Sequence, residues 1–162
     1  MLVPLVDLAA QYQALRGDID PAIQRVLDRT SFILGEAVRD FEAAFAGYAG
    51  TLGAVGVASG TAALELTFRA LGIGSGDEII TTAHTFIATA EAITNVGARP
   101  VFADIEVDTF NIDPEHVEEL VNERTRAILP VHLYGRPARL STSAYLQRWP
   151  PALPLFLVPC RT

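Results

Sequence analysis

The chain has 162 residues, half of them hydrophobic, and its 12 basic and 19 acidic residues give a net charge of −7. All 12 basic residues are arginine, so no lysine side chain is present to form a Schiff base. The composition suits one globular domain with a substantial core, and it argues against disorder and against a nucleic-acid binder, which would carry a basic stripe.

A single cysteine, Cys160, excludes an intrachain disulfide. The first residues lack the basic region of a signal peptide, and no apolar run approaches the 18 or so residues that span a bilayer. We therefore expect a cytoplasmic protein that does not associate with membranes.

Two amphipathic helices are predicted in the first 50 residues. Asp20 is a capping carboxylate before Pro21, which suits the first position of a helix, so a helix is expected to begin there. A second helix is expected from about Ala37, with apolar residues on one face, and it should stop near Gly50.

From residue 54 onward, short strands alternate with helices. Strands are expected at 55–58, 78–81, 100–105 and 127–131, and helices at 61–71, 85–96 and 114–121. This alternation predicts an α/β domain of three layers, with helices on both faces of a largely parallel sheet. Ligands of such sheets lie beyond the carboxyl ends of the strands, which here points to the segments 59–61, 82–86 and 132–135.

The strongest local signal is Ser59-Gly60-Thr61, where a predicted strand meets a predicted helix. Gly60 permits close approach to the backbone, and the free amides and dipole of a helix start favour an anion such as a phosphate. A plain helix cap with a tight turn explains the same residues equally well. The glycine pattern matches neither a dinucleotide fingerprint nor a phosphate-binding P-loop.

Phe86 follows the second predicted strand. An aromatic ring there can stack on a planar cofactor, although a place in the core is the commoner role for phenylalanine. His84, His116 and His132 are scattered along the chain and are interpreted as structural or exposed, so no metal site is expected.

Three aspartates could be mistaken for a catalytic cluster. Asp104, Asp108 and Asp113 fall at a strand end, in a turn and at a helix cap, and turn chemistry explains them more simply. Ser59 lacks the surrounding pattern of a serine nucleophile. No catalytic residue is assigned.

Several long segments together resemble the amino-terminal half of the DegT/StrS-type sugar aminotransferases, which are pyridoxal 5′-phosphate (PLP) enzymes of the aspartate aminotransferase fold. The resemblance covers roughly residues 2–139 and is carried by FILGEAVRDFEAAFAGYAG, AVGVASGTAALELTFRALGIGSGDEIITTAHTFIATAEAI, GARPVFADIEVDTFNIDPEHVEEL and RTRAILPVHLYGRPA. It implies that residues 1–139 are the amino-terminal part of the large domain of a type I PLP-dependent transferase.

The resemblance also implies roles for individual residues. Gly60 and Thr61 would bind the PLP phosphate through backbone amides, and Phe86 would stack on the pyridine ring. The implied reaction transfers an amino group, usually from glutamate, to a keto carbon of a nucleotide-linked deoxysugar in amino-sugar biosynthesis. Family members are typically homodimers.

Two residues that the family needs have no counterpart here: the lysine that attaches PLP and the aspartate that pairs with its ring nitrogen. The window in which the aspartate should fall contains the apolar run 155–158, and no acidic residue follows Glu123. Residues 140–162 differ from the family and are interpreted as a frameshifted or truncated tail. The chain by itself is therefore expected to be inactive; the alternative is a non-catalytic PLP or nucleotide-sugar binding protein.

Overall fold

The structure is a computed structural model, in which residues 6–139 are described. The predicted tail, residues 140–162, and the apolar run within it lie outside the described residues. The chain divides into two compact units, residues 1–56 and 57–162, and each is described by itself.

The first unit contains helices α1 (Leu8–Asp28) and α2 (Glu36–Ala49). The expectation that a helix begins at Asp20 and Pro21 is wrong: α1 begins thirteen residues earlier, capped by the Asp7 side chain, and Pro21 lies inside it. The Asp20 carboxylate does not cap a helix, since it accepts hydrogen bonds from Tyr12 (2.7 Å) and Arg16 (3.0 Å) in the preceding turns.

The predicted second helix is confirmed. Its end is set by Gly50, which adopts a left-handed conformation (φ 67°) that glycine tolerates at a helix end. No helix in residues 6–139 combines the length and the apolar character needed to cross a bilayer.

The second unit is an α/β arrangement. Its elements are α3 (Gly60–Ala70), β1 (Glu78–Thr82), α4 (Ala88–Asn95), β2 (Arg99–Ala103), α5 (Pro114–Leu120), β3 (Thr125–Ile128) and a 3-10 turn, η1 (Leu133–Gly135). The three strands are parallel and lie in the order β2-β1-β3. The α/β class and the parallel sheet are thus confirmed.

The expectation of a strand at residues 55–58 is wrong. These residues form no regular element, and the Val55 side chain is exposed. A strand needs a partner for its backbone groups, and none of the three described strands pairs with this segment.

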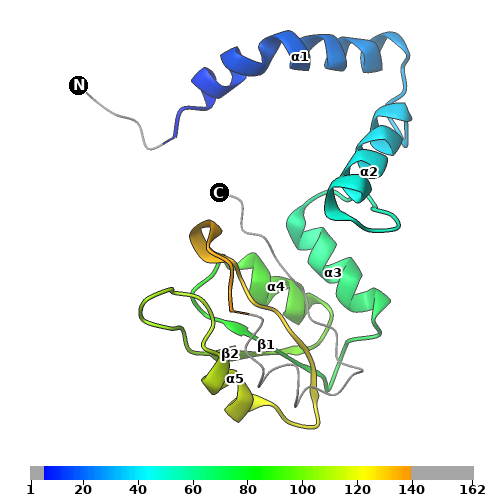
Figure 1. The fold of residues 1–162 in the computed structure, drawn as a ribbon. Coiled ribbons are helices and arrows are strands. Elements are labelled where there is room, and N and C mark those ends of the chain that lie inside the picture. Colours follow the sequence, from blue (N-terminus) through cyan, green and yellow to red (C-terminus); the bar gives the residue numbers. More distant parts are fainter. Residues whose placement is uncertain (1–5, 140–162) are drawn as a thin grey trace, which may run out of the picture. The chain divides into compact units, whose positions relative to one another are not determined.

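Two apolar clusters, one on each face of the sheet, make three layers (Figure 1). Neighbouring residues of β1 point to opposite faces: Ile79 packs with Phe68 of α3 and Ile93 of α4, whereas Ile80 packs with Val117 of α5. Every residue of β1 is buried, as expected of a central strand covered on both faces.

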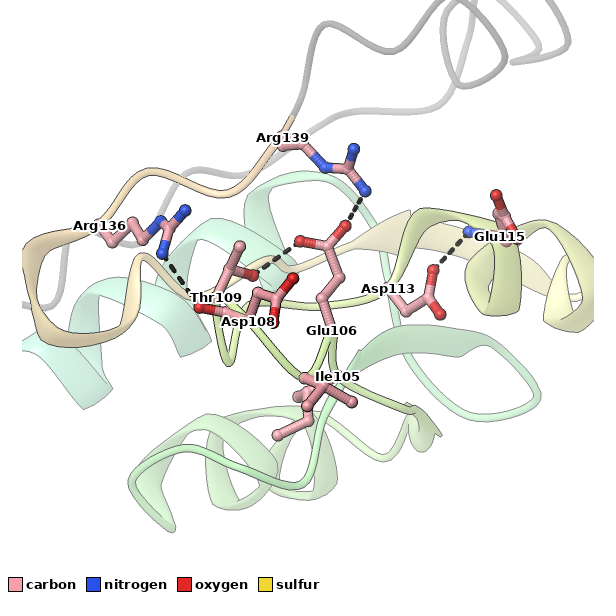
Figure 2. Close-up of a pocket in the computed structure, with 9 residues that line it drawn as sticks. Ile105, Glu106, Asp108, Thr109, Asp113, Glu115, Arg136 and Arg139 are labelled. Carbon is pink, nitrogen blue, oxygen red and sulfur yellow. Dashed lines mark hydrogen bonds and ion pairs between the residues drawn. The ribbon is translucent and has the colours of Figure 1, made fainter.

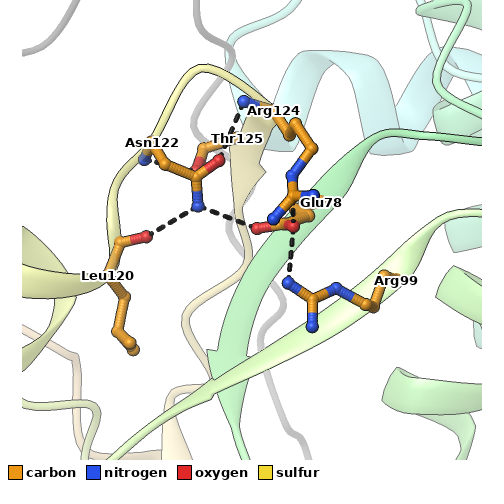
Figure 3. A network of polar contacts seen from close by, with 6 residues as sticks. All are labelled: Glu78, Arg99, Leu120, Asn122, Arg124 and Thr125. Atoms are coloured by element: carbon orange, nitrogen blue, oxygen red, sulfur yellow. Dashed lines mark hydrogen bonds and ion pairs between the residues drawn. The ribbon is translucent and has the colours of Figure 1, made fainter.

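A buried carboxylate joins the starts of all three strands (Figure 3). Glu78 is the first residue of β1, and its side chain is only 2% exposed. One carboxylate oxygen accepts a hydrogen bond from Arg99 of β2 (2.6 Å) and forms an ion pair with Arg124, just before β3 (2.8 Å). The other accepts from the Asn122 side chain (2.9 Å).

Hydrogen bonds from Asn122 and Arg99, with the charges of Arg124 and Arg99, lower the pKa of Glu78 below its ordinary value of 4.5, although burial opposes the shift. The ionised form is therefore the one that the fold stabilises.

Glu78→Gln should destabilise the chain by about 2–4 kcal/mol, because the charge is lost while two arginines keep theirs and an amide N–H faces the Asn122 donor. Urea unfolding measures the loss. The control is Glu36→Gln, which removes an exposed ion pair with Arg29 and should cost about 0.5 kcal/mol or less.

The difference between wild type and Glu78→Gln should also depend on pH. Because the pKa is lower in the folded state, the carboxylate contributes fully above about pH 5, and this stability is lost as the pH falls through the folded-state pKa. The free energies of unfolding of the two proteins should converge below pH 4.5. A difference that stays constant from pH 6 to pH 3 would contradict the assigned role.

Candidate functional site

The carboxyl ends of the strands define one edge of the sheet, and α3 begins at the same edge. Only the short connection 71–77 separates the end of α3 from the start of β1, and the two elements pack through Phe68 and Ile79. Helix and strand therefore run antiparallel, and both are about 16 Å long. The first turn of α3 consequently lies toward the carboxyl end of β1.

The first turn of α3 presents two free backbone donors. The Ser59 side chain caps the helix by accepting from the Ala62 amide (3.1 Å), and the Ser59 carbonyl accepts from the Ala63 amide (2.9 Å). Within the described residues, the amides of Gly60 and Thr61 have no acceptor. Nothing lies within 4 Å of the point where a Gly60 side chain would begin. The sequence left a helix cap and an anion site as alternatives. The same turn can provide both, because the cap uses the Ser59 side chain and leaves the Gly60 and Thr61 amides free.

The segment after β1 carries Phe86. The Thr82 hydroxyl accepts from the His84 amide (3.1 Å), and the hydroxyls of Thr85 and Thr89 are 3.0 Å apart. Phe86 is 72% exposed, so it is not a core residue. Its ring is available for stacking, a role that remains a prediction.

The third segment, after β3, contains η1 with Tyr134 in a left-handed conformation (φ 54°). His132 is structural, since its Nδ1 accepts from the Ala138 amide (2.9 Å). In the same way, Nδ1 of His116 accepts from the Asp104 amide (2.9 Å). No group of three potential metal ligands occurs in the described residues.

A buried asparagine ties this third segment to the loop that follows β2. Asn111 is 1% exposed, and its oxygen accepts from the Leu133 amide (3.2 Å). Its side-chain nitrogen donates to the carbonyls of Arg136 (3.1 Å) and Pro137 (3.2 Å). One side chain therefore fixes the backbone of residues 133–137.

Two arginines reinforce the same connection (Figure 2). Arg136 donates to the Asp108 carbonyl (3.1 Å), and Arg139 pairs with Glu106, which also accepts from the Thr109 hydroxyl (2.7 Å). Burial raises the pKa of Glu106, but the Thr109 and Arg139 hydrogen bonds and the charges of both arginines outweigh it, so the net shift is downward. These residues line a cavity of about 520 Å³.

All three aspartates have the local positions expected of them, and Asp108 lies in the turn 107–109. Asp113 caps α5 by accepting from the Glu115 amide (2.9 Å), and Asp104 accepts from the Ile105 amide (2.8 Å). Asp108 lies at the rim of the cavity and contributes its backbone carbonyl. The carboxylate bonds of Asp104 and Asp113 are thus local ones, as turn chemistry predicts.

The sequence of the chain matches the family model of the DegT/DnrJ/EryC1/StrS aminotransferases over residues 13–148. The chain belongs to this family. A dTDP-3-amino-3,4,6-trideoxy-α-D-glucose transaminase of Streptomyces venezuelae is 51% identical over 136 residues, which cover 84% of this chain and 36% of that relative. The chain thus spans little more than a third of the relative's length.

Solved structures of the family show the same fold. S. venezuelae DesV in complex with a ketimine intermediate has a TM-score of 0.82 at 50% identity, over 85% of this chain and 37% of that one. NtdA from Bacillus subtilis, with the cofactor PMP bound, has a TM-score of 0.81 at 34% identity, over 85% and 32% of the two chains. The described fold is therefore part of the fold of PLP-dependent aminotransferases.

The sequence did not indicate the connections made by Asn111, Arg136 and Glu106. An asparagine between an aromatic residue and an apolar one is typical of many turns, and nothing local shows that its partners lie more than twenty residues later. The family resemblance could locate the segments but not the side chain that joins them.

Asn111→Ala should lower the free energy of unfolding by about 2–3 kcal/mol, because it leaves a buried amide and two carbonyls without partners. It should also speed hydrogen exchange of the Leu133 amide, which NMR can follow. Asn95→Ala is the control, since Asn95 bonds to Glu65 at an exposed position. Equal effects of the two substitutions would contradict the role of Asn111.

Proposed function

We propose that these residues form the cofactor-binding part of a PLP-dependent aminotransferase that acts on nucleotide-linked keto-sugars, with glutamate as the amino donor and a homodimer as the working form. Membership of the family supports the reaction class. The observation that carries the proposal is the pair of free amides, at Gly60 and Thr61, at the carboxyl edge of the sheet.

The phosphate end of the cofactor fits this turn. Two N–H groups that have no acceptor among residues 6–139, at the positive end of the α3 dipole, suit a dianionic group. The empty space beside Gly60 lets phosphate oxygens approach the backbone, which a larger side chain would hinder. Gly60 and Thr61 would hold the phosphate, and Ser59 would keep the turn in shape.

Phe86 would cover one face of the pyridine ring. Its exposed side chain follows β1 at the edge where α3 begins, and aromatic rings stack favourably when offset. When bound, PLP supplies the electron sink for amino-group transfer. The described residues would bind and orient it.

The 162 residues contain no lysine, so they have no side-chain amine for covalent attachment of the cofactor. We expect them to bind the cofactor non-covalently and, by themselves, not to transfer an amino group. The other reading, a protein that binds nucleotide-sugars without PLP, predicts no preference for a phosphorylated cofactor.

Pyridoxamine 5′-phosphate tests the phosphate site, because it has no aldehyde that could react with the amino terminus. It should bind more tightly than pyridoxamine, and Gly60→Pro should weaken its binding more than tenfold, through loss of one hydrogen bond to a charged group worth about 1.5 kcal/mol or more. Isothermal titration calorimetry measures both affinities.

Gly60→Pro is a mild change to the fold. Proline suits the first position of a helix, Ser59 before it is extended, and the lost N–H has no partner in the described residues. Leu8→Pro, at the first position of α1, is the matched control and should leave binding unchanged. Equal affinity of wild type and Gly60→Pro for pyridoxamine 5′-phosphate would refute the proposed phosphate site.

Phe86→Ala should weaken pyridoxamine 5′-phosphate by about threefold to tenfold through loss of stacking, and it should scarcely change the urea midpoint because the ring is exposed. Its effect on pyridoxamine should be the same, since the ring face does not touch the phosphate. Ile87→Ala, at an exposed neighbour, serves as the control. If both substitutions have the same effect, Phe86 has no stacking role.

A further inference from the structure

Three aromatic rings meet at the carboxyl edge of the sheet. Each comes from the segment that follows one of the three strands: His84 after β1, Phe110 after β2 and Tyr134 after β3. The His84 ring lies 6.0 Å from that of Phe110 and 6.3 Å from that of Tyr134, measured between centroids, with interplanar angles of 41° and 73°. We call these three residues the aromatic cluster. His84 is two residues from Phe86, so their Cα atoms are at most roughly 7 Å apart.

The backbone is strained at two of the three members. Phe110 (φ 58°) and Tyr134 (φ 54°) adopt left-handed conformations, which are unfavourable for bulky side chains. Both belong to the second unit, in which they are the only described non-glycine residues with positive φ. Strain of this kind persists where surrounding contacts impose it, and it is commonest at functional sites.

The contacts that impose the strain connect the two loops. Asn111, directly after Phe110, binds the backbone on both sides of Tyr134. Glu106 accepts a backbone bond from Phe110 through its carbonyl (2.9 Å) and pairs with Arg139 through its side chain. Tyr134 therefore lies in backbone that Asn111 holds from the other loop. Phe110 lies beside Asn111 and bonds to Glu106, the two residues whose side chains bind that backbone segment and Arg139.

The cluster has the chemistry of a sugar-ring site. Phe110 is 47% exposed and Tyr134 is 70% exposed, so their rings offer apolar faces to solvent. The imidazoles of His116 and His132 accept backbone amides, whereas no such bond ties the His84 ring in the described part of the chain. An imidazole and a phenol among aromatic faces can bind the hydroxyls and the C–H face of a pyranose.

We propose that His84, Phe110 and Tyr134 form the subsite for the sugar ring of the nucleotide-linked substrate, an inference that rests on the proposed function. The sugar must lie next to the cofactor for its keto carbon to react, and the cluster flanks Phe86, which is proposed to cover the cofactor ring.

NMR titration of the 162-residue chain with millimolar dTDP-glucose, and separately with dTDP, tests the subsite. The chain has three histidines, so His116 and His132 act as internal references for His84. We expect dTDP-glucose to shift the imidazole C–H signals of His84 and dTDP to leave them in place. Equal shifts with both probes, which would indicate the base or phosphates, or no shift with either, would overturn the proposal.

Phe110→Asn and Tyr134→Asn are the deciding variants, because asparagine tolerates the left-handed conformation. Each should raise the urea midpoint slightly while weakening the sugar-dependent response about threefold to tenfold. Phe102→Ala removes an equally exposed phenylalanine (47%) from β2 and should leave the response unchanged. If either asparagine variant keeps the full response, that residue is not part of the subsite.

The two proposals fail separately. Loss of pyridoxamine 5′-phosphate binding in Gly60→Pro tests the phosphate turn. The response of the His84 signals to dTDP-glucose tests the aromatic cluster. A chain that prefers the phosphorylated cofactor but shows no sugar-dependent shift at His84 would retain the proposed function and refute the subsite.

Discussion

The interaction on which the second unit most depends is the buried ion-pair network of Glu78. A carboxylate that is withdrawn from solvent needs several polar partners, and here they are Arg99 at the start of β2 and Asn122 and Arg124 in the loop before β3. The pairing of Glu78 with Arg99 across β1 and β2, and with Thr125 across β1 and β3, fixes where each strand begins. The register between β1 and β3 shifts by one residue directly after Glu78, where Ile79 pairs with Ala127.

The edge at the amino ends of the strands and the edge at their carboxyl ends therefore differ in how their polar groups are satisfied. The amino edge satisfies a buried charge, and its polar groups bind one another (Figure 3). At the carboxyl edge, the amides of Gly60 and Thr61 have no acceptor within the described residues, the ring of Phe86 is exposed, and the imidazole of His84 has ring contacts but no hydrogen bond in this part of the chain. Asn111, Arg136 and Arg139 join the loop 104–113, which follows β2, to the segment 132–139. This edge is therefore rigid although it is irregular.

Much of this arrangement could be predicted from sequence where the cause is local. The cap of α3 at Ser59, the cap of α5 at Asp113 and the end of α2 at Gly50 depend on side chains and glycine within a few residues. The errors have non-local or competing causes. Asp20 and Pro21 match a helix start, but the Asp7 cap and contacts with Tyr12 and Arg16 extend the helix through them.

The candidate site shows the same division. Gly60, Thr61 and Phe86 were indicated by their place after predicted strands and by family resemblance. Asn111 and the left-handed residues Phe110 and Tyr134 were not, because the bonds of Asn111 that join their two loops connect residues more than twenty positions apart. No local pattern predicts that a phenylalanine will adopt a conformation typical of glycine.

The exclusive use of arginine affects how the fold responds to alkali. In the Glu78 and Glu106 networks, the cations are guanidinium groups, which remain protonated at any pH that proteins tolerate. A lysine in their place would lose its charge in strong base and leave a buried carboxylate without a counter-ion. Both networks therefore lose their ion pairs only at low pH, where their carboxylates become protonated.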